Sequence, residues 1–99
     1  MIDRFINWLN TKEEVIQNMG IKLDRIIDAR NEGDGSYTVS HVSVHCIGQI
    51  IAWDKRFIDL EVLELKNGDR ILYIHCEYKK DIDLDALFDN YFKAMIRGQ

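Results

Sequence analysis

Two alternating segments joined by a tight-turn sequence constrain the fold of this chain more than any other feature. In FIDLEVLEL, Ile58, Leu60 and Val62 lie on one face of an extended chain. Asp59 and Glu61 lie on the other face. The sequence KNGD follows, and its Asn-Gly pair tolerates positive φ at both central positions of a two-residue turn. The next segment, RILYIHCEY, is therefore expected to pair antiparallel with FIDLEVLEL.

The residues before this hairpin predict further strands. Residues 21–29 have an imperfect period of two, because Arg25 interrupts their apolar positions. The polar run NEGDGS predicts a turn into a strand that contains Val39. Beyond Val39 the apolar parity shifts by one residue, which predicts a β-bulge near Ser40 and His41. The evenly apolar IGQIIAWD is typical of a strand that lies near the sheet centre or is covered on both faces.

A helix is predicted at the N-terminus. Phe5, Leu9 and Ile16 lie close to one apolar stripe, and Gly20 is a natural residue to end the last turn. The capping-box sequence TKEE also allows two short helices that meet at Asn10, although one helix is the preferred interpretation.

A second helix is predicted at the C-terminus, where Asp81 or Asp83 can cap its first turn. Its apolar stripe consists of Leu84, Leu87, Phe88, Tyr91 and Met95. Together these elements predict an α+β fold: an antiparallel β-meander of four to five strands, with the N- and C-terminal helices packed on one face. A chain of 99 residues is expected to be a single domain over residues 1–99.

The charge balance narrows the choice of partner. Thirteen basic and seventeen acidic residues give a net charge of -4, which disfavours binding to nucleic acid or to an anionic membrane surface. The opening residues, MIDRFINWLN, lack the basic stretch and apolar core of a signal peptide. We therefore expect a cytoplasmic protein whose two cysteines remain thiols.

The dipeptide His-Cys occurs twice, as His45-Cys46 and His75-Cys76, and raises the question of a metal site. Neighbouring residues of a strand point to opposite faces, so neither dipeptide is expected to bind a metal with both side chains. The cysteines are predicted to pack as small apolar residues. The metal hypothesis that remains is a site formed by His41, His45 and His75 on a common outer face. The sequence contains no C-x-x-C or H-x-x-x-H pattern that would support it.

Catalysis receives little support from the sequence. Ser43 shares parity with His41 and His45, but same-face neighbours on a strand lie about 6.5–7 Å apart, too far for direct proton transfer. The sequence contains no G-x-S-x-G, G-x-x-x-x-G-K or G-x-G-x-x-G motif. We therefore expect a protein that is not an enzyme and holds no cofactor.

Protein binding is the expected activity of such a chain. Acidic side chains on strands favour encounter with a basic partner. The predicted contact residues are Asp24, Asp28, Trp53, Asp59, Glu61 and Glu64. Solvation of the surface is the alternative for each carboxylate. Trp8, Tyr37, Tyr73 and Tyr78 could stack on bases, but without a basic stripe they are expected to be core residues, and a core position is also the alternative for Trp53.

The chain also resembles a known family. MIDRFINWLN, the run IGQIIAWDKRFIDLEVLELKNGDRILYIHCEY and the closing DALFDNYFKAM are similar to bacterial immunity proteins called TriTu. This resemblance implies a cytosolic antidote that binds a TreTu toxin, an ADP-ribosyltransferase that modifies elongation factor Tu and is used in competition between bacteria. It also implies that the chain blocks the active-site cleft of the toxin and that NAD belongs to the toxin. We expect the chain to be a monomer in the free state or a heterodimer with the toxin.

Two other functions remain open from the sequence. One is a small ligand- or metal-binding domain that uses His41, His45 and His75. The other is a structural module that assembles with copies of itself through an unpaired edge strand.

Overall fold

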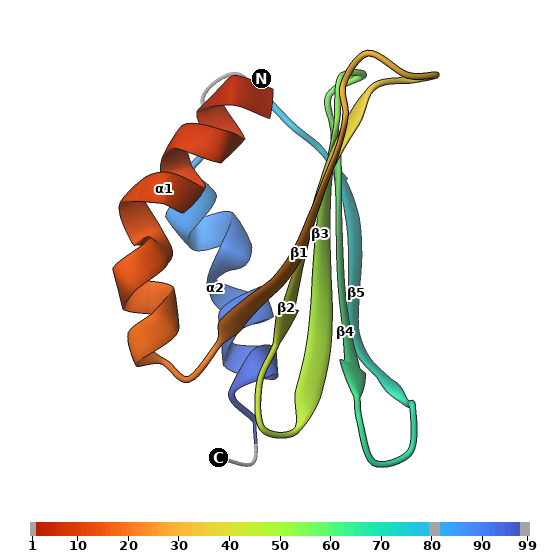
Figure 1. The fold of residues 1–99 in the computed structure, drawn as a ribbon. Helices are drawn as coiled ribbons and strands as arrows, with labels where there is room; N and C mark the ends of the chain where they lie inside the picture. Colours follow the sequence, from red (N-terminus) through yellow and green to blue (C-terminus); the bar gives the residue numbers. More distant parts are fainter. Residues whose placement is uncertain (1, 80–81, 98–99) are drawn as a thin grey trace.

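A computed structural model describes residues 2–79 and 82–97 of the chain and shows five strands in one sheet, with one helix before them and one after them along the chain (Figure 1). The sheet is antiparallel throughout, and its strand order follows the sequence. The predicted α+β meander is therefore confirmed. The elements are α1 (Ile2–Asn18), β1 (Lys22–Ala29), β2 (Ser36–Val42), β3 (Cys46–Trp53), β4 (Phe57–Glu64), β5 (Arg70–Glu77) and α2 (Leu84–Met95).

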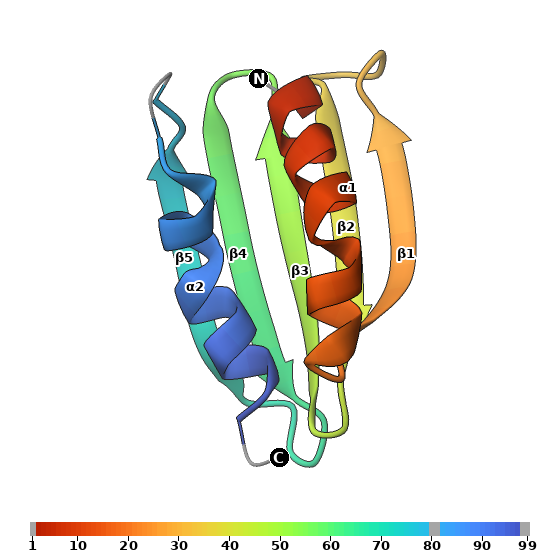
Figure 2. The same ribbon diagram turned by 90° about the vertical axis from the view of Figure 1, so that its left-hand side faces the viewer.

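The two helices lie side by side on one face of the sheet. Figure 2 shows α1 over β2 and β3 and α2 over β4 and β5, while β1 extends beyond α1. Trp8 of α1 donates an indole hydrogen bond to the Asp85 carboxylate of α2 at 2.8 Å and packs against the Phe88 ring. The opposite face of the sheet is covered by neither helix.

The core fills the space between the helices and the sheet. Alternation places Ile58, Leu60 and Val62 of β4 there, and all three side chains are fully buried, as predicted. From α2, Phe88, Tyr91 and Met95 enter the same layer, together with Phe92, which the predicted stripe omits. Burial of these apolar and aromatic side chains is the main source of stability in a small domain.

Gly48 of β3 allows α2 to approach the sheet closely. A Cβ atom at this position would lie 2.5 Å from both Tyr91 Oη and Met95 Sδ. The absence of a side chain is therefore a packing requirement here.

The ends of the helices agree with most of the sequence interpretation. α1 is one uninterrupted helix, so the two-helix alternative is wrong. Gly20 follows it with φ of +82°, a conformation that favours glycine. Asp83 caps α2 by accepting a hydrogen bond from the Ala86 amide. The other predicted cap, Asp81, lies outside the described residues.

Three predictions about strands need correction. The predicted bulge near Ser40 and His41 is not in β2 itself, which pairs with β3 in unbroken register as far as Val42. The register shift of the β1–β2 pair lies directly opposite these two residues, in β1 between Leu23 and Arg25, and another irregularity lies at the end of β4. The apolar parity was misleading because residues 43–45 form the connection to β3, where Val44 is exposed.

The other two corrections concern turns and burial. Asn67-Gly68 does lie in the β4–β5 hairpin, but only Gly68 has a positive φ, so the turn is not the predicted two-residue form. Of the two alternatives given for IGQIIAWD, the central position in the sheet is confirmed for β3. Coverage on both faces is wrong, because the helices cover only one face of the strand. β1 is exposed along almost its whole length, although its period predicted a half-buried strand.

Candidate functional site

The candidate site is the face of the sheet that the helices leave uncovered, which we call the open face. Its residues follow from the strand registers, because they alternate with the buried positions. They include Ile27, Thr38, Ser40, Ile47, Gln49, Ile51, Trp53, Phe57, Asp59, Glu61, Leu63, Tyr73 and His75. This set contains three large aromatic side chains and several aliphatic ones, and Lys22 and Arg25 of β1 lie on the same face at its edge.

A group of four residues, the Trp53 cluster, is fixed on this face by mutual contacts. Asp59 accepts a hydrogen bond from Trp53 Nε1 at 2.9 Å and another from Nδ1 of His75, its cross-strand neighbour. Phe57 stacks on the His75 ring with centroids 5.1 Å apart. Because each side chain already has a partner, little rotamer freedom remains to be lost when another protein binds.

A second group lies beside the Trp53 cluster. Glu61 forms an ion pair with Arg70 at 3.0 Å, and the Arg70 guanidinium lies 4.7 Å from the centre of the Tyr73 ring. Glu61 and Tyr73 are cross-strand neighbours. The Glu61 charge is thus partly neutralised within the molecule, which weakens its attraction for a distant basic partner.

The structure brings together four of the six predicted contact residues. Trp53, Asp59 and Glu61 are on the open face, and Asp24 at the β1 irregularity lines a shallow hollow there with Glu61. Asp28 and Glu64 are elsewhere, since their strand partners face the helices. Whether any of the six contacts a partner remains a prediction.

Asp28 and Glu64 have local roles on the helix side. Asp28 is ion-paired with Arg30 at 2.7 Å, and Arg30 also reaches Asp3 of α1. The hydrogen bond from Arg30 lowers the pKa of the Asp28 carboxyl. Glu64 lies directly opposite Cys46 in the β3–β4 register.

The three histidines do not share one face. His41 is only 3% exposed and packs under α2, where its Nδ1 is hydrogen-bonded to Tyr91 Oη at 2.8 Å. Burial lowers the pKa of His41 to about 4. His45 lies in the connection between β2 and β3, and His75 lies on the open face. The predicted common outer face is therefore wrong, because β2 keeps its parity and turns His41 inward.

The cysteines behave as predicted. Cys46 and Cys76 are free thiols on the helix side of β3 and β5, with β4 between them. Burial raises the pKa of both thiols, which keeps them protonated and weakly nucleophilic near neutral pH. In the described part of the chain, no group of three or more His, Cys, Asp or Glu side chains could hold a metal ion.

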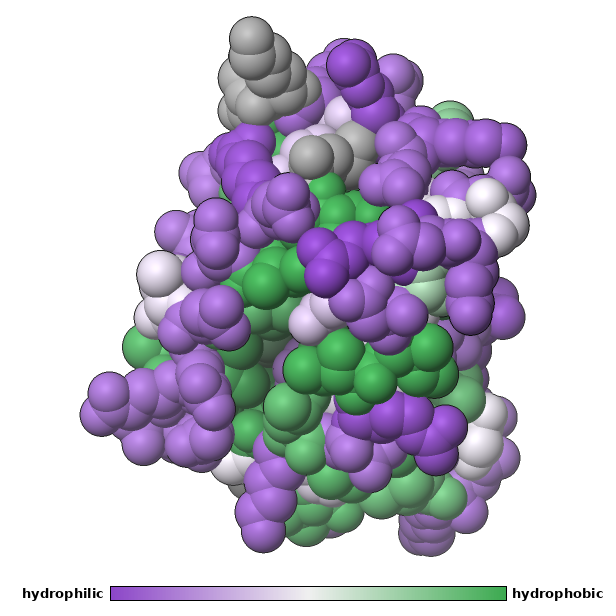
Figure 3. All heavy atoms as spheres, turned by 45° about the horizontal axis from the view of Figure 1, so that its top comes forward, coloured by the Kyte–Doolittle hydropathy of each residue, from purple (hydrophilic) through white to green (hydrophobic). Residues whose placement is uncertain are grey.

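Besides a hollow between α1 and α2, two hollows lie away from the open face. The α1–β1 groove separates the first helix from the edge strand, and its apolar walls are formed by Ile6, Leu9, Ile16, Ile21, Leu23 and Ile26. Figure 3 looks onto the side of the molecule that carries α1 and β1, and apolar atoms gather between the two. The groove has a volume of about 230 Å³.

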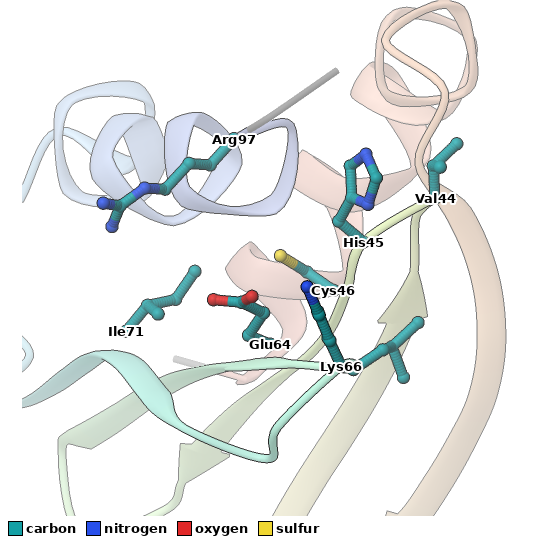
Figure 4. Close-up of a pocket in the computed structure, with 8 residues that line it drawn as sticks. Val44, His45, Cys46, Glu64, Lys66, Ile71 and Arg97 are labelled. Atoms are coloured by element: carbon teal, nitrogen blue, oxygen red, sulfur yellow. The ribbon is translucent and has the colours of Figure 1, made fainter.

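The other hollow lies at the end of the sheet that carries the β2–β3 and β4–β5 connections, with a volume of about 490 Å³. Figure 4 shows His45, Cys46, Glu64 and Lys66 around it and Arg97 on the side of α2. Charges of both signs line it, and its thiol is protonated, so the arrangement provides neither an activated nucleophile nor a uniform field for a charged ligand.

Sequence reasoning did not include Phe57, Arg70 and Tyr73 among the predicted contact residues. Phe57 precedes Asp59 by two positions, and Tyr73 precedes His75 by two, so strand parity alone could have identified both. Of the aromatic residues assigned to the core, Tyr37 and Tyr78 are buried, Trp8 is half-buried between the helices, and Tyr73 is exposed.

Comparisons with known proteins agree with the geometry of a binding protein. Neither helix, over the residues described, has the length and apolar character needed to cross a membrane. No curated protein and no solved structure matches the chain. Residues 3–94 match the family described as Immunity protein TriTu, which covers nearly all of the sequence. The chain therefore belongs to the TriTu family of immunity proteins.

Proposed function

We propose that this immunity protein acts as a single domain that binds its cognate toxin through the open face and leaves the chemistry to the toxin. The observation that carries the proposal is the Trp53 cluster, in which an indole, a phenyl ring and an imidazole are held on an uncovered sheet face by Asp59 and by stacking. Rigid aromatic side chains of this kind supply much of the affinity in protein interfaces.

The composition of the open face supports this choice. Interface centres are enriched in aromatic residues and arginine and depleted in lysine, and the centre of the open face on β3, β4 and β5, with Arg70 at its margin, follows this pattern. The outer surfaces of the helices carry charged side chains such as Glu13, Glu14, Asp89 and Lys93. A flat sheet face is also rigid, and rigidity favours slow dissociation, which an antidote requires.

The proposed toxin is an ADP-ribosyltransferase of the TreTu type that modifies elongation factor Tu, as the family resemblance implies. The immunity protein would occlude the active-site cleft of this toxin in the cytosol, so that NAD or the target cannot enter. NAD is then a ligand of the toxin. The free antidote is proposed to be a monomer that forms a heterodimer with the toxin.

The test is the affinity of variants for a catalytically inactive form of the toxin, measured by calorimetry. Trp53→Ala should weaken binding by at least about 30-fold, because removal of a central aromatic contact costs about 2 kcal/mol or more. Glu14→Ala, at an exposed position of α1, is the control and should bind as the wild type does.

The two variants also distinguish the ways in which the proposal can be wrong. Normal binding by Trp53→Ala together with weak binding by Glu14→Ala would move the interface to the helices. No binding by the wild-type protein would reject the toxin itself as the partner.

A further inference from the structure

We propose that an extended segment of the toxin adds to the free edge of β1 and covers the α1–β1 groove. This inference rests on the proposed function for the identity of the partner, and it assigns a second contact region and a mode of binding. Within the described residues β1 pairs with β2 alone, so one edge of its backbone has no strand beside it. An unpaired edge is a template for another extended chain.

The exposure of β1 is unusual for a strand with this sequence. Leu23 and Ile26 face the helix side and are 54% and 47% exposed, and Ile27 on the other side is 47% exposed. Burial of an aliphatic side chain away from water is favourable, and these three residues leave a large part of that free energy unused in the free protein. A partner strand would cover them.

The opposite edge of the sheet differs from β1. On β5 the helix-side residues Leu72, Ile74 and Cys76 are half-buried and pack against the core beneath α2. On β1 no helix lies above the equivalent positions, because α1 lies over β2 and β3 (Figure 2). The fold therefore protects one edge strand and leaves the other exposed on both faces.

The charges of β1 favour a different chain over a second copy of this one. In a two-fold antiparallel pair of β1 strands, each residue meets a residue of the same face. A pair centred on Arg25 or on Asp28 sets identical charges against each other, and one centred on Ile26 sets Arg25 against Ile27. A pair centred on Ile27 sets Ile26 against Asp28. The irregularity at Asp24 also allows a pair that sets Leu23 against Ile26, but this pair sets Lys22 against Ile27. None of these registers matches apolar with apolar and charge with opposite charge along the strand.

The position of β1 also connects the two contact regions. Ile27 belongs to the open face, while Ile26 forms part of the groove wall. A strand added beside β1 would continue the sheet, so that its alternating side chains cover the groove on one side and extend the open face on the other. The segment that fits has apolar residues at alternate positions on the groove side. One toxin molecule could then bind the Trp53 cluster and the β1 edge together.

Hydrogen exchange of the wild-type proteins tests this inference without a variant. Backbone amides of β1 should exchange at least about tenfold more slowly in the complex with inactive toxin than in the free protein, because strand addition gives them hydrogen-bond partners. Amides of α2, which lies away from β1, should be unchanged.

A matched pair of variants gives a second readout. Ile26→Lys should weaken toxin binding by about tenfold, since it places an ammonium group where an apolar side chain would be buried. Val15→Lys is the control, because Val15 is similarly exposed at 49% but lies on α1. Both variants should keep the circular dichroism spectrum of the wild type.

The outcomes separate this inference from the function on which it rests. Unprotected β1 amides in the complex, with equal binding by Ile26→Lys and Val15→Lys, would overturn strand addition, while weak binding by Trp53→Ala would still support the open face. Failure of the wild-type protein to bind the toxin would reject both. Concentration-dependent protection of β1 in the absence of toxin would show that a second copy covers the edge, and would also overturn the inference.

Discussion

His41 and His75 lie on opposite faces of one sheet and show how differently the two faces are used. His41 is buried beneath α2 and is hydrogen-bonded to Tyr91. His75 is exposed, pairs with Asp59 and stacks on Phe57. On the covered face a polar group is enclosed by the core and has to be satisfied there. On the open face polar and aromatic groups hold each other in place while remaining accessible to a partner.

The difference indicates that stability and binding are divided between the two faces. Substitutions on the covered face should change the free energy of unfolding, because they remove buried contacts. Substitutions on the open face should change affinity for the toxin and leave stability nearly intact, because their side chains contact little of the core. A protein organised in this way can change its partner without losing its fold.

The largest expected effect comes from truncating the same residue type on each face. Phe88→Ala should lower the free energy of unfolding by about 3–5 kcal/mol, since Phe88 is 0% exposed and packs edge-on against Phe5. Phe57→Ala should cost less than about 1 kcal/mol, because Phe57 is 39% exposed. Urea denaturation of both variants, followed by circular dichroism, measures the two values.

Equal losses of stability in these two variants would contradict the division between the faces. A large loss for Phe57→Ala alone would mean that the Trp53 cluster is a structural element of the sheet. The binding assay sharpens the comparison, because Phe57→Ala is expected to weaken toxin binding while it remains folded.

The covered face should also make stability dependent on pH. The pKa of His41 falls from its ordinary value of 6.5 to about 4 in the folded protein. Between these values the unfolded chain binds a proton that the folded protein does not, so stability should decrease as the pH falls from about 6.5 towards 4. The loss at pH 4 should reach up to about 3 kcal/mol. Denaturation midpoints at several pH values measure it.

Two glutamine variants separate the histidines in this experiment. His41→Gln should remove most of the slope in this window, even if it lowers stability at every pH. His75→Gln should leave the contribution of His41 in place, since the two side chains lie on opposite faces. A slope that disappears in His75→Gln and persists in His41→Gln would assign the pH dependence to the open face.

The sequence predicted which side chains of β4 face the core, but it did not predict the contacts between residues far apart in the chain. The alternation of β4 identified Ile58, Leu60 and Val62 as buried and Asp59 and Glu61 as outward, because strand parity is a local property. His41 was assigned outward because Val42 and Val44 looked like a continued strand. In the fold its partner is Tyr91, fifty residues away in sequence, which no local pattern reveals.

The candidate site was predicted only in part, again because some of its contacts depend on residues far apart in the sequence. Asp59 and Trp53 were both identified, but their hydrogen bond depends on the β3–β4 register and on the turn between the strands. The pairing of Asp59 with His75 depends on the loop around Gly68, which is longer than the two-residue turn that the Asn-Gly pair suggested. Parity can be read from the sequence, whereas register requires knowledge of the turns.

Removal of the negative charges of the open face should have the smallest effect on the free energy of unfolding. Its main effect should be on the rate of association with the toxin. Replacing Asp59 by Asn and Glu61 by Gln together removes two negative charges and keeps the shape of both side chains. Stopped-flow measurements should show slower association with the toxin, by up to about tenfold at low salt, and a weaker dependence on salt. The loss in free energy of unfolding should be about 1 kcal/mol or less, because the ion pair of Glu61 with Arg70 lies at the surface.

The control for this double variant changes the net charge equally at another place. Glu14→Gln with Asp89→Asn also removes two negative charges, but from exposed positions of α1 and α2 that do not line the α1–β1 groove. If the open face meets the toxin, the helix pair should change association less than the open-face pair, because charges more than about 8 Å from the contact are largely screened at physiological salt. Equal slowing by both pairs would show that the overall charge of -4 governs the encounter, and the acidic residues of the open face would then have no special part in steering.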